Sequence, residues 1–423
     1  MGREIFLTVG TGRDRRDIAE ALAKSIRHHR PDRTWLLTSV KTEQETVPIL
    51  REVLGKAASQ IETRVFEDPD DAEVCCREAR RWIEARLTAG IGPDEVVVDY
   101  TSGTKAMSVG LFAAAVALGV ETISYVAGRR DETGRVIPGG ERFTSFTPRM
   151  LYAQRDLDRA AWLFDRNRFE EAASLAADAA SCGDSEISAR ARVAARMAEA
   201  FGAWDRFDHT TAFRGLDTLG DDVRLDLWPV RPAVERAKQF LYRAKSERFC
   251  VERLADLAAN ARRRFEEGKY DDAVARCYRA FEYLAQLGQH RLGLDPTDLR
   301  WDAVAPKLPE PLHQSWQEKV DPRGRLRLGL RNGYELLRDL GETLGSKFCR
   351  EYEDKGSLLR TRLEQRNNSI LAHGAEPVGR DAAMDLLETL GRFARSESPQ
   401  WDALVMAATF PRLGQAGASP AVR

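Results

Sequence analysis

The sequence predicts an α/β domain followed by an all-α region. Over residues 1 to about 150, short apolar runs of strand length alternate with longer stretches that have the period of a helix. Strands separated by helices form a parallel, doubly wound sheet. From about Leu151 onward the strand signals stop, and nearly every segment has helical periodicity. A chain of 423 residues also exceeds what a single small core holds, so we expect two or three domains.

The elements of the first domain can be placed in order. Its strands are predicted at Ile5 to Val9, Trp35 to Thr38, Arg64 to Phe66, Glu95 to Tyr100 and Thr122 to Val126. Its helices are predicted from about Asp17 to His28, Glu43 to Lys56, Ala72 to Leu87 and Ala106 to Leu118. A hairpin around Arg135 to Phe146, with its turn at Pro138-Gly139-Gly140, is expected to close this unit.

Two segments of the helical region echo each other. LFDRNRFEEAASLAADAA, from Leu163, and RFEEGKYDDAVARCYRAFEYLAQ, from Arg264, each have an aromatic, a polar turn, a second aromatic, paired acids and a small-residue helix. This pattern is typical of a helical hairpin, and a tetratricopeptide-like repeat scaffold is the alternative. A Pro/Gly-rich, basic interval from about Pro306 to Gly329 interrupts the helices. The predicted domains are residues 1–150, 151–245 and 246–410, with a disordered tail at 411–423.

Composition excludes several classes of protein. A hydrophobic content of 43% and a formal net charge of -1 describe a globular protein, so any nucleic-acid site must be a local patch. The six cysteines form no Cys-x-x-Cys and no cluster with histidine, which argues against zinc and disulfides and favours a reducing cytoplasm. The most apolar run, Val109 to Val120, is shorter than the roughly 20 residues that cross a bilayer. We expect no membrane segment and no export signal.

The segment DYTSGTK, from Asp99 to Lys105, leaves the carboxyl end of a predicted buried strand and enters a helix. Open α/β sheets bind ligands at such junctions, because free backbone N–H groups and the positive helix end face anionic oxygens. Neither the Walker spacing nor the GxGxxG fingerprint is present. The alternative is a tight turn with a Ser/Thr helix cap. The loop after the first strand lies at the same predicted edge. The predicted ligand-binding residues are therefore Gly10, Thr11, Gly12, Arg13, Thr101, Ser102, Gly103, Thr104 and Lys105.

The segment LEQRNNSILAHG, near the carboxyl end, is the second candidate site. On one continuous helix, Leu359, Leu363, Arg366, Ile370 and His373 would form a single stripe that is apolar except for its cation and its imidazole. An unpaired buried Arg is costly, so this stripe would have to open onto a cleft, a partner chain or an anionic ligand. Gly374 is the expected helix stop, which would place the imidazole at the negative end of the helix dipole. The alternative is an Arg at a wet helix edge and a capping His.

These motifs also resemble those of known domains. VVVDYTSGTKAMSVGL resembles the signature of the CARF domain, a CRISPR-associated Rossmann-like sensor domain. RNNSILAHG is similar to the HEPN ribonuclease motif, an Arg followed after four to six residues by a His. YDDAVARCYRAFEYLAQ resembles the first HEPN helix of the CARF-HEPN proteins of type III CRISPR systems. The resemblance covers roughly residues 3–126 and 260–390, and the helices between them match only loosely.

The resemblance implies a function and its parts. It implies a homodimer whose paired CARF domains bind one cyclic oligoadenylate as an allosteric activator. It also implies that Arg366 and His373 of both chains, assisted by Asn367, form a composite site that cuts single-stranded RNA without a metal or other cofactor. The product would be a 2',3'-cyclic phosphate and a 5'-hydroxyl. Two alternatives stay open: a CARF domain that cleaves the ring messenger, using hydroxyls such as those of Thr11 and Thr101, or a messenger-gated adaptor without catalysis.

Other polar residues carry weaker signals. Arg279 and Glu282 are expected to form a surface pair. The basic runs Arg262-Arg263-Arg264 and Arg323 to Arg331 are candidates for guiding an RNA backbone, with solvated faces as the alternative. The remaining histidines have no acid or Cys partner at a useful spacing and receive no role.

Overall fold

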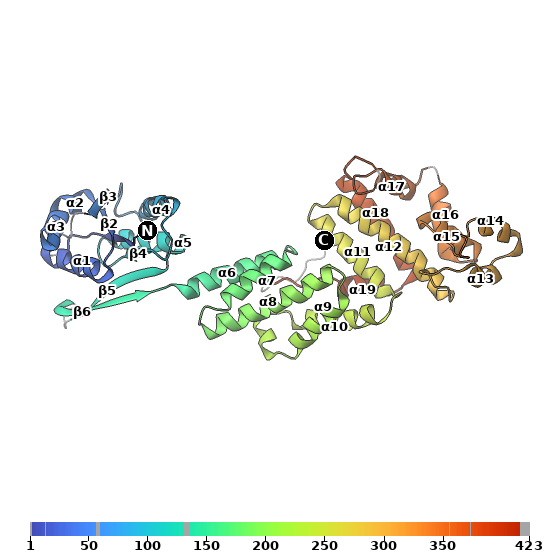
Figure 1. The fold of residues 1–423 in the computed structure, drawn as a ribbon, viewed down its shortest axis with the longest axis horizontal. Helices are drawn as coiled ribbons and strands as arrows, with labels where there is room; N and C mark the ends of the chain where they lie inside the picture. Colours follow the sequence, from blue (N-terminus) through green and yellow to red (C-terminus); the bar gives the residue numbers. More distant parts are fainter. Residues whose placement is uncertain are drawn as a thin grey trace. The chain divides into compact units, whose positions relative to one another are not determined.

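The computed structural model describes residues 2–12, 14–55, 60–130, 136–354, 356–372 and 374–414, with the backbone alone at 128–130 and 136–141. The chain divides into two compact units: residues 1–155 with 182–184, and residues 156–181 with 185–423. The first unit contains a mostly parallel sheet covered by helices, and the second is helical (Figure 1). The predicted fold class, α/β followed by all-α, is confirmed.

The sheet of the first unit has the strand order β3-β2-β1-β4-β5-β6 among the described residues. Its strands are β1 (Glu4–Thr8), β2 (Arg33–Thr38), β3 (Ile61–Val65), β4 (Val96–Asp99), β5 (Thr122–Arg130) and β6 (Val136–Phe146). β1 to β5 pair in parallel, and β6 pairs antiparallel to β5. The helices are α1 (Arg15–His29), α2 (Val40–Glu45), α3 (Val47–Leu54), α4 (Ala72–Thr88) and α5 (Lys105–Ala117).

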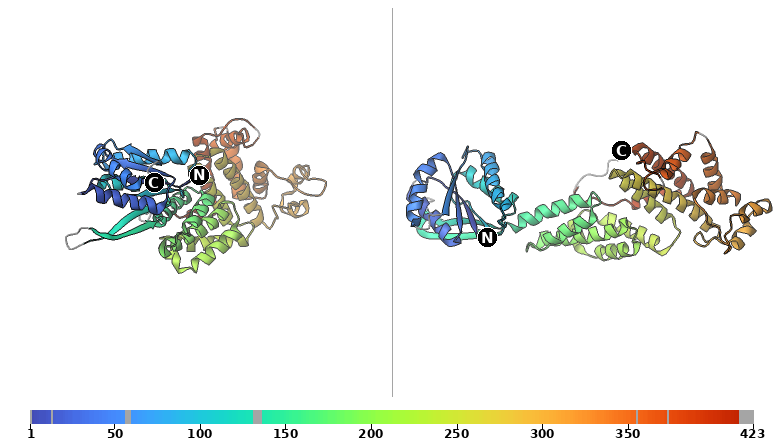
Figure 2. Two further views of the ribbon diagram at one scale, coloured as in Figure 1. Left: turned by 60° about the vertical axis from the view of Figure 1, so that its left-hand side comes forward. Right: turned by 45° about the horizontal axis from the view of Figure 1, so that its top comes forward.

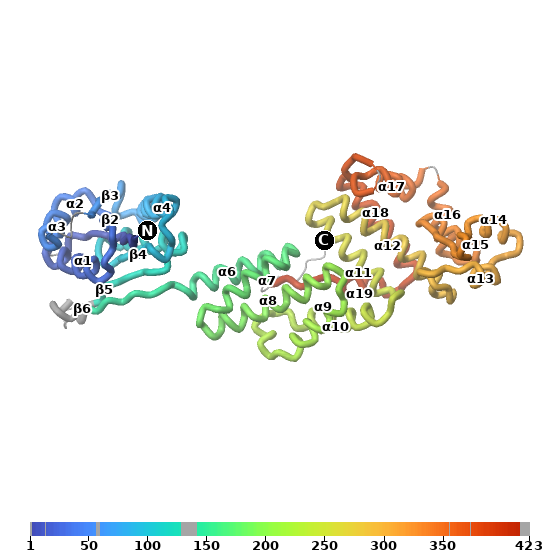
Figure 3. Tube along the Cα trace, viewed as in Figure 1, coloured from blue at the N-terminus to red at the C-terminus, as the bar shows by residue number. Residues whose placement is uncertain are grey.

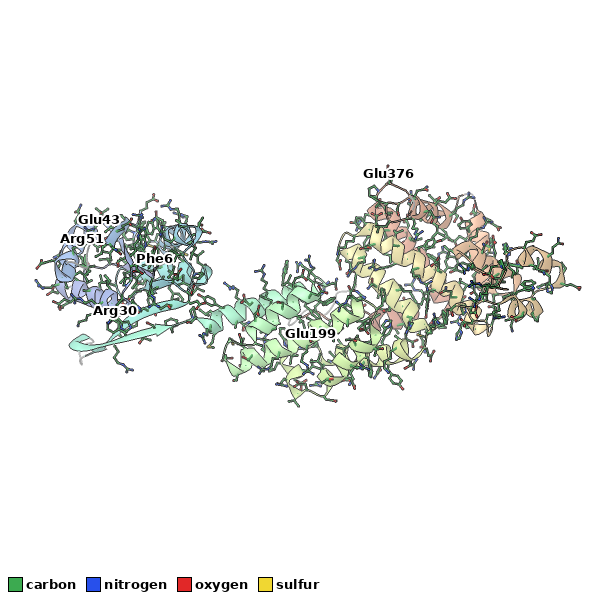
Figure 4. The ribbon with its side chains drawn as sticks, in the orientation of Figure 1. Phe6, Arg30, Glu43, Arg51, Glu199 and Glu376 are labelled. Carbon is green, nitrogen blue, oxygen red and sulfur yellow. The ribbon has the colours of Figure 1, made fainter. Side chains whose placement is uncertain are left out.

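Alternation along the central strands divides the core between the two faces of the sheet. Phe6 and Val98 pack with α4 and α5 on one face, whereas Leu7 and Val97 pack with α1 and α3 on the other. The right-hand view of Figure 2 shows the strands with helices on both sides, and Phe6 is labelled among them in Figure 4. Burial on both faces explains why these strands read as continuous apolar runs.

Two local predictions in this unit are wrong. Pro138, Gly139 and Gly140 lie within β6, so the hairpin turn is not there; β5 and β6 are joined through 131–135, outside the described residues. The helix expected from Glu43 to Lys56 is two helices, α2 and α3. Pro48 stands in the first turn of α3, where its missing N–H is tolerated but where it cannot continue α2.

The second unit is built from helices that follow one another with short turns. Its longer helices are α6 (Arg149–Phe164, which begins in the first unit), α7 (Phe169–Ala179), α8 (Ser185–Asp205), α9 (His209–Gly220), α10 (Arg231–Ser246), α11 (Val251–Glu266), α12 (Tyr270–Arg291), α15 (Leu330–Asp339), α16 (Thr343–Glu353), α17 (Leu358–Asn367) and α18 (Arg380–Glu397). Successive helices from α7 to α10 contact one another, as the tube in Figure 3 shows.

The two echoing segments both form helical hairpins, α6–α7 and α11–α12. Each turn contains a residue with positive φ, Asn167 at 58° and Gly268 at 75°. The two turns also meet, since the Asn167 side-chain amide donates to the Glu267 carboxylate at 3.1 Å. The shared sequence pattern therefore marks two hairpins that pack turn to turn.

The remaining parts of this unit contain short elements. α13 (Trp301–Val304) and η3 (Ala305–Lys307) lead into the basic interval, which holds η4 (Glu310–Leu312) and α14 (His313–Gln317). The last described helix, α19 (Trp401–Ala407), precedes the predicted tail. Within that tail, the N–H groups of Leu413 and Gly414 donate to the Asp165 carboxylate at 2.6 and 3.0 Å, so its first residues are bound to the turn that follows α6. Residues 415–423 lie outside the described residues.

Candidate functional site

The two predicted ligand-binding loops lie in contact at the carboxyl edge of the sheet. They follow β1 and β4, the neighbouring strands at which the strand order reverses, and this is where open α/β sheets form a binding crevice. The Gly10 N–H donates to the Ser102 hydroxyl at 2.9 Å. A Cβ at Gly10 would lie 2.8 Å from the Gly103 backbone nitrogen, so glycine permits this close approach.

The hydroxyls of the second loop are engaged inside the unit. The Thr101 hydroxyl accepts from the Val126 N–H at 2.8 Å. The Thr104 hydroxyl caps α5 by accepting from the Met107 N–H at 3.1 Å and donates to the carbonyl oxygen of Pro69. Ser102 is only 8% exposed and accepts from Gly10. The predicted helix cap is therefore real, and these hydroxyls fix the shape of the loop.

The groups at this edge that suit an anionic ligand are Lys105 and the backbone. Lys105 is exposed at the first position of α5. The first turn of a helix carries N–H groups without intrahelical acceptors, and its dipole end is positive. Gly103, with a φ of 95°, turns the chain into this helix, and the Gly10–Gly12 loop lies beside it. Arg13 lies outside the described residues.

Asp99 is a residue of this edge to which the sequence assigned no role. Its side chain is fully buried at the end of β4 and accepts hydrogen bonds from the hydroxyls of Ser25 and Ser124 and from the Thr101 N–H, the last at 2.9 Å. Burial raises the pKa of this carboxyl despite these bonds. The sequence did contain a signal for this role, namely an acid at the end of an otherwise apolar strand. A buried acid in such a place needs hydrogen-bond partners that are also buried.

In the second unit, the prediction of one helix from Leu359 through His373 is wrong. α17 ends at Asn367, with Asn368 as its C-cap, so Arg366 and His373 do not share a helical stripe. Leu359 and Leu363 are buried as expected, but Ile370 is 61% exposed. The run Asn367-Asn368-Ser369 favours this early stop, because Asn and Ser side chains compete with the helix for backbone groups; here the Ser369 hydroxyl bonds the Arg366 carbonyl.

The chain reverses direction after α17 in a hydrogen-bonded loop, residues 368–376. The Ser369 hydroxyl donates to the Arg366 carbonyl at 2.8 Å, and the Gly374 N–H donates to the Ser369 carbonyl at 3.1 Å. The Ile370 N–H donates at 3.1 Å to the carbonyl of Glu376, which Figure 4 labels. Gly374 is pressed against the Asn368 backbone, where no Cβ would fit. Gly374 therefore closes this loop and does not end the helix. His373 lies within the loop but outside the described residues.

The Arg366 side chain is partly buried and lies on an aromatic ring. Its guanidinium carbon lies 3.9 Å from the centroid of the Tyr278 ring, on α12. Its Nη1 donates to the side-chain oxygen of Asn367 at 3.2 Å. Among the residues that the structure describes, no carboxylate forms an ion pair with Arg366. Its positive charge is therefore available to an anion.

The candidate RNA-guiding arginines are mostly paired. Arg263 is 6% exposed, bonded to Asp205 at 2.8 Å, and Arg264 contacts Asp205 at 3.0 Å. These two stabilise the packing of α11 on α8 and cannot guide RNA, because the inward face of an amphipathic helix carries them. In the basic interval, Arg325 pairs with Asp298 at 2.8 Å. The expected surface pair is present, with Arg279 and Glu282 3.4 Å apart.

His209 has an acidic partner that sequence spacing did not show. Its Nε2 lies 2.7 Å from the Asp256 carboxylate, which also accepts from the Trp204 indole at 3.0 Å. The partners come from α8, α9 and α11, so no local motif marks them. Across the described part of the chain, no group of three His, Cys, Asp or Glu side chains has the arrangement of a metal site. No helix of that part has the length and apolarity that crossing a membrane requires.

Comparisons with known proteins agree with this arrangement. The family model of the Csm6 6H domain matches residues 152–243, and that of the Csm6 HEPN domain matches residues 243–397. Among solved structures, the chain is similar to Enterococcus italicus Csm6 bound to cyclic hexa-2'-fluoro-hexa-dAMP. The TM-score is 0.56 at 14% identity, covering 96% of this chain and 98% of that one. This likeness shows the fold. No curated protein sequence matches the chain.

A Rossmann-like unit with a switch-point loop pair, followed by a helical unit that matches the Csm6 HEPN model, is the arrangement of the CARF-HEPN class of CRISPR effectors. The two family matches together span more than half of the chain. The chain belongs to the Csm6 family.

Proposed function

We propose that this CARF-HEPN effector is a cyclic-oligoadenylate-activated endoribonuclease that cuts single-stranded RNA in type III CRISPR defence. Its parts are a CARF domain (1–150), a helical linker domain (151–245) and a HEPN ribonuclease domain (246–410). The match of residues 243–397 to the Csm6 HEPN model supports the ribonuclease assignment.

One observation carries the catalytic proposal: Arg366 is a cation without a carboxylate partner among the described residues, directly before the loop that contains His373. A guanidinium held in this way is suited to the extra negative charge that develops on a phosphate under attack. Asn367, which accepts a hydrogen bond from Arg366, assists as a polar neighbour.

The reaction is transfer of the phosphate within the RNA. The 2'-oxygen forms a bond to the adjacent phosphorus as the bond from phosphorus to the 5'-oxygen breaks. The proton of the 2'-hydroxyl leaves to a base, and the 5'-oxygen receives a proton, with His373 as the group that moves it. The products are a 2',3'-cyclic phosphate and a 5'-hydroxyl, and no metal ion takes part. Two copies of the chain pair so that both sets of Arg366 and His373 surround one phosphodiester.

The activator binds at the edge formed by the Gly10–Arg13 and Thr101–Lys105 loops. The E. italicus Csm6 structure contains a cyclic hexanucleotide analogue, which supports a cyclic oligoadenylate as the ligand class here. Exposed Lys105, the amino end of α5 and the glycine-lined backbone suit its phosphates.

The test uses labelled single-stranded RNA with the full chain, with and without cyclic tetra- and hexa-adenylate, in buffer containing EDTA. We expect ring-dependent cutting that falls by at least about 100-fold in Arg366→Ala and His373→Ala. Arg360→Ala is the matched control, because Arg360 lies on the same helix but is ion-paired with Glu364 at 2.8 Å. We expect this control to cut at the wild-type rate.

Other outcomes separate the competing functions. Loss of the ring without RNA cutting would identify a ring nuclease. Ring binding without cleavage of either molecule would identify an adaptor. RNA cutting that survives both Arg366→Ala and His373→Ala would refute the catalytic assignment.

A further inference from the structure

We propose that α12 positions the Arg366–His373 segment at two points: Tyr278 holds the Arg366 guanidinium, and Asp271 holds the chain just after the loop. This inference rests on the proposed ribonuclease function. Tyr278 and Asp271 are positioning residues, because they act through Arg366 and the loop and not on the RNA itself.

The first contact is the stack of Arg366 on Tyr278, at 3.9 Å from guanidinium carbon to ring centroid. An aromatic face attracts a cation without neutralising it, whereas a carboxylate would occupy the N–H groups that a phosphate needs. Burial raises the pKa of Tyr278, so the ring stays a neutral phenol at physiological pH. Tyr278 can therefore fix the plane of the guanidinium while leaving its charge in place.

The ring sits on a well-supported part of α12. One turn further along this helix, the Phe281 carbonyl accepts from the buried Tyr334 hydroxyl at 2.8 Å. The Tyr334 ring stacks on Phe348 at 3.7 Å between centroids. Because α12 is tied to α15 and α16 in this way, Tyr278 offers Arg366 a fixed surface.

The second contact lies seven residues earlier on α12. Both carboxylate oxygens of Asp271 accept from the Val378 N–H at 3.2 Å. Seven residues are about two helical turns, so Asp271 and Tyr278 share a face of α12, roughly 10 Å apart. Arg366 precedes the loop and Val378 follows it. One helix face therefore holds both ends of the segment that contains His373.

The two contacts differ from ordinary packing in a way that kinetics can detect. If Tyr278 only fills space, its replacement has the same effect whether or not Arg366 is present. If it orients Arg366, its effect on kcat disappears once Arg366 is gone. A phenylalanine keeps the ring face and loses only the hydroxyl, so Tyr278→Phe should behave as wild type.

The experiment measures kcat and KM for RNA cutting by the ring-activated full chain. We expect Tyr278→Leu to lower kcat by roughly 3- to 30-fold, the range of a desolvated cation–π contact. Tyr278→Phe should stay within about twofold. Trp162→Leu is the matched control, because Arg166, just after α6, stacks on Trp162 at 3.8 Å and this pair has no part in the proposed site. We expect its kcat to be unchanged.

The decisive comparison is the double variant. Tyr278→Leu with Arg366→Ala should be no slower than Arg366→Ala alone. Losses that multiply, or a wild-type kcat in Tyr278→Leu, would overturn the inference and leave the proposed function standing. Full activity of Arg366→Ala would overturn both.

Asp271 supplies a second test that does not require the Tyr278 variant to fold. We expect Asp271→Ala to lower kcat by roughly 3- to 10-fold, because the Val378 N–H loses a charged acceptor. Asp271→Asn keeps an acceptor oxygen and should retain most of the activity. Equal rates for Asp271→Ala and wild type would overturn the second contact.

Discussion

The two loops that hold the predicted site residues are built in opposite ways. In the ligand loop, Thr101–Lys105, the hydroxyls accept hydrogen bonds from backbone groups of neighbouring segments: the Val126 N–H donates to Thr101, and the Gly10 N–H donates to Ser102. The nuclease loop, residues 368–376, closes on its own backbone, and Arg366 at its entrance contacts an aromatic ring and a neutral amide. At a sheet edge, polar side chains become part of the framework. At the end of α17, the Arg366 charge has no carboxylate partner among the described residues.

This difference predicts where each loop is most vulnerable. The ligand loop should depend on its backbone and on Lys105 for recognition, and its hydroxyls should matter for stability. The nuclease loop should depend on its closure, because the catalytic geometry has no surrounding sheet to hold it.

The largest expected effect comes from opening the nuclease loop. In Gly374→Ala, the new Cβ would collide with the Asn368 backbone, so residues 368–374 must move apart. A displacement of about 1 Å at a reacting group costs on the order of 100-fold in rate. We therefore expect ring-activated RNA cutting to fall by about that factor, measured as kcat, with ring binding unchanged.

The matched control for this prediction is Gly379→Ala. Gly379 lies just beyond the same loop, at the N-cap of α18, and a Cβ there would meet no atom within 4 Å. Its rate should equal that of the wild type. Wild-type cutting by Gly374→Ala would show that the closed loop is not the catalytic form.

The same contrast explains what the sequence could predict. The parallel sheet could be predicted from the pattern of apolar residues, because Val96, Val97 and Val98 form an uninterrupted apolar run and are buried on both faces of the sheet. The shared edge of the two ligand loops followed from the rule that neighbouring parallel strands end at one edge, whereas the hydrogen bond between Gly10 and Ser102 is a finding of the structure. These features depend on local sequence patterns and on the general rules of parallel sheets, so they can be predicted from the sequence.

The parts that were missed depend on contacts distant in the sequence. The spacing of seven between Arg366 and His373 matched a helical stripe, but the helix ends at Asn367, where the Ser369 hydroxyl bonds the Arg366 carbonyl. No periodicity links Arg366 to Tyr278, on a helix 88 residues earlier. Likewise, nothing in the run Arg262-Arg263-Arg264 indicated that the Arg263 side chain points inward and binds Asp205.

A smaller effect is expected from the exposed cation of the ligand loop. Lys105→Met should raise the concentration of the activating cyclic oligoadenylate needed for half-maximal activation by about 10-fold, because a charge-assisted hydrogen bond to phosphate is lost. The maximal cutting rate should not change, since the nuclease loop is untouched. Lys41→Met, which replaces an exposed lysine on α2, is the control. A lower maximal rate with an unchanged midpoint would contradict the assignment of Lys105 to ligand binding.

The last expected effect is on stability and not on the cutting rate, and it concerns how the framework behind the ligand loop depends on pH. Burial lowers the pKa of His29 to about 4, from an ordinary value of 6.5, and its Nε2 lies 2.9 Å from the hydroxyl of Ser124, which donates to Asp99. Between these two pH values, the unfolded chain holds a proton that the folded unit lacks. His29 should therefore make the first unit less stable as the pH falls from about 6.5 toward 4, by up to about 3 kcal/mol. The raised pKa of Asp99 offsets part of this loss, because the folded carboxyl takes up a proton at a higher pH than the unfolded one.

Amide hydrogen exchange on the full chain can measure this loss at the strands themselves. After correction for intrinsic exchange rates, opening of β5 should become easier at pH 5 than at pH 7 in the wild type, and less so in His29→Gln, which has no group that titrates there. Peptides from α12 serve as the internal reference, because His29 lies in the other unit. If β5 exchange depends on pH equally in the wild type and in His29→Gln, the buried imidazole is not the cause of the pH-dependent stability of this part of the sheet.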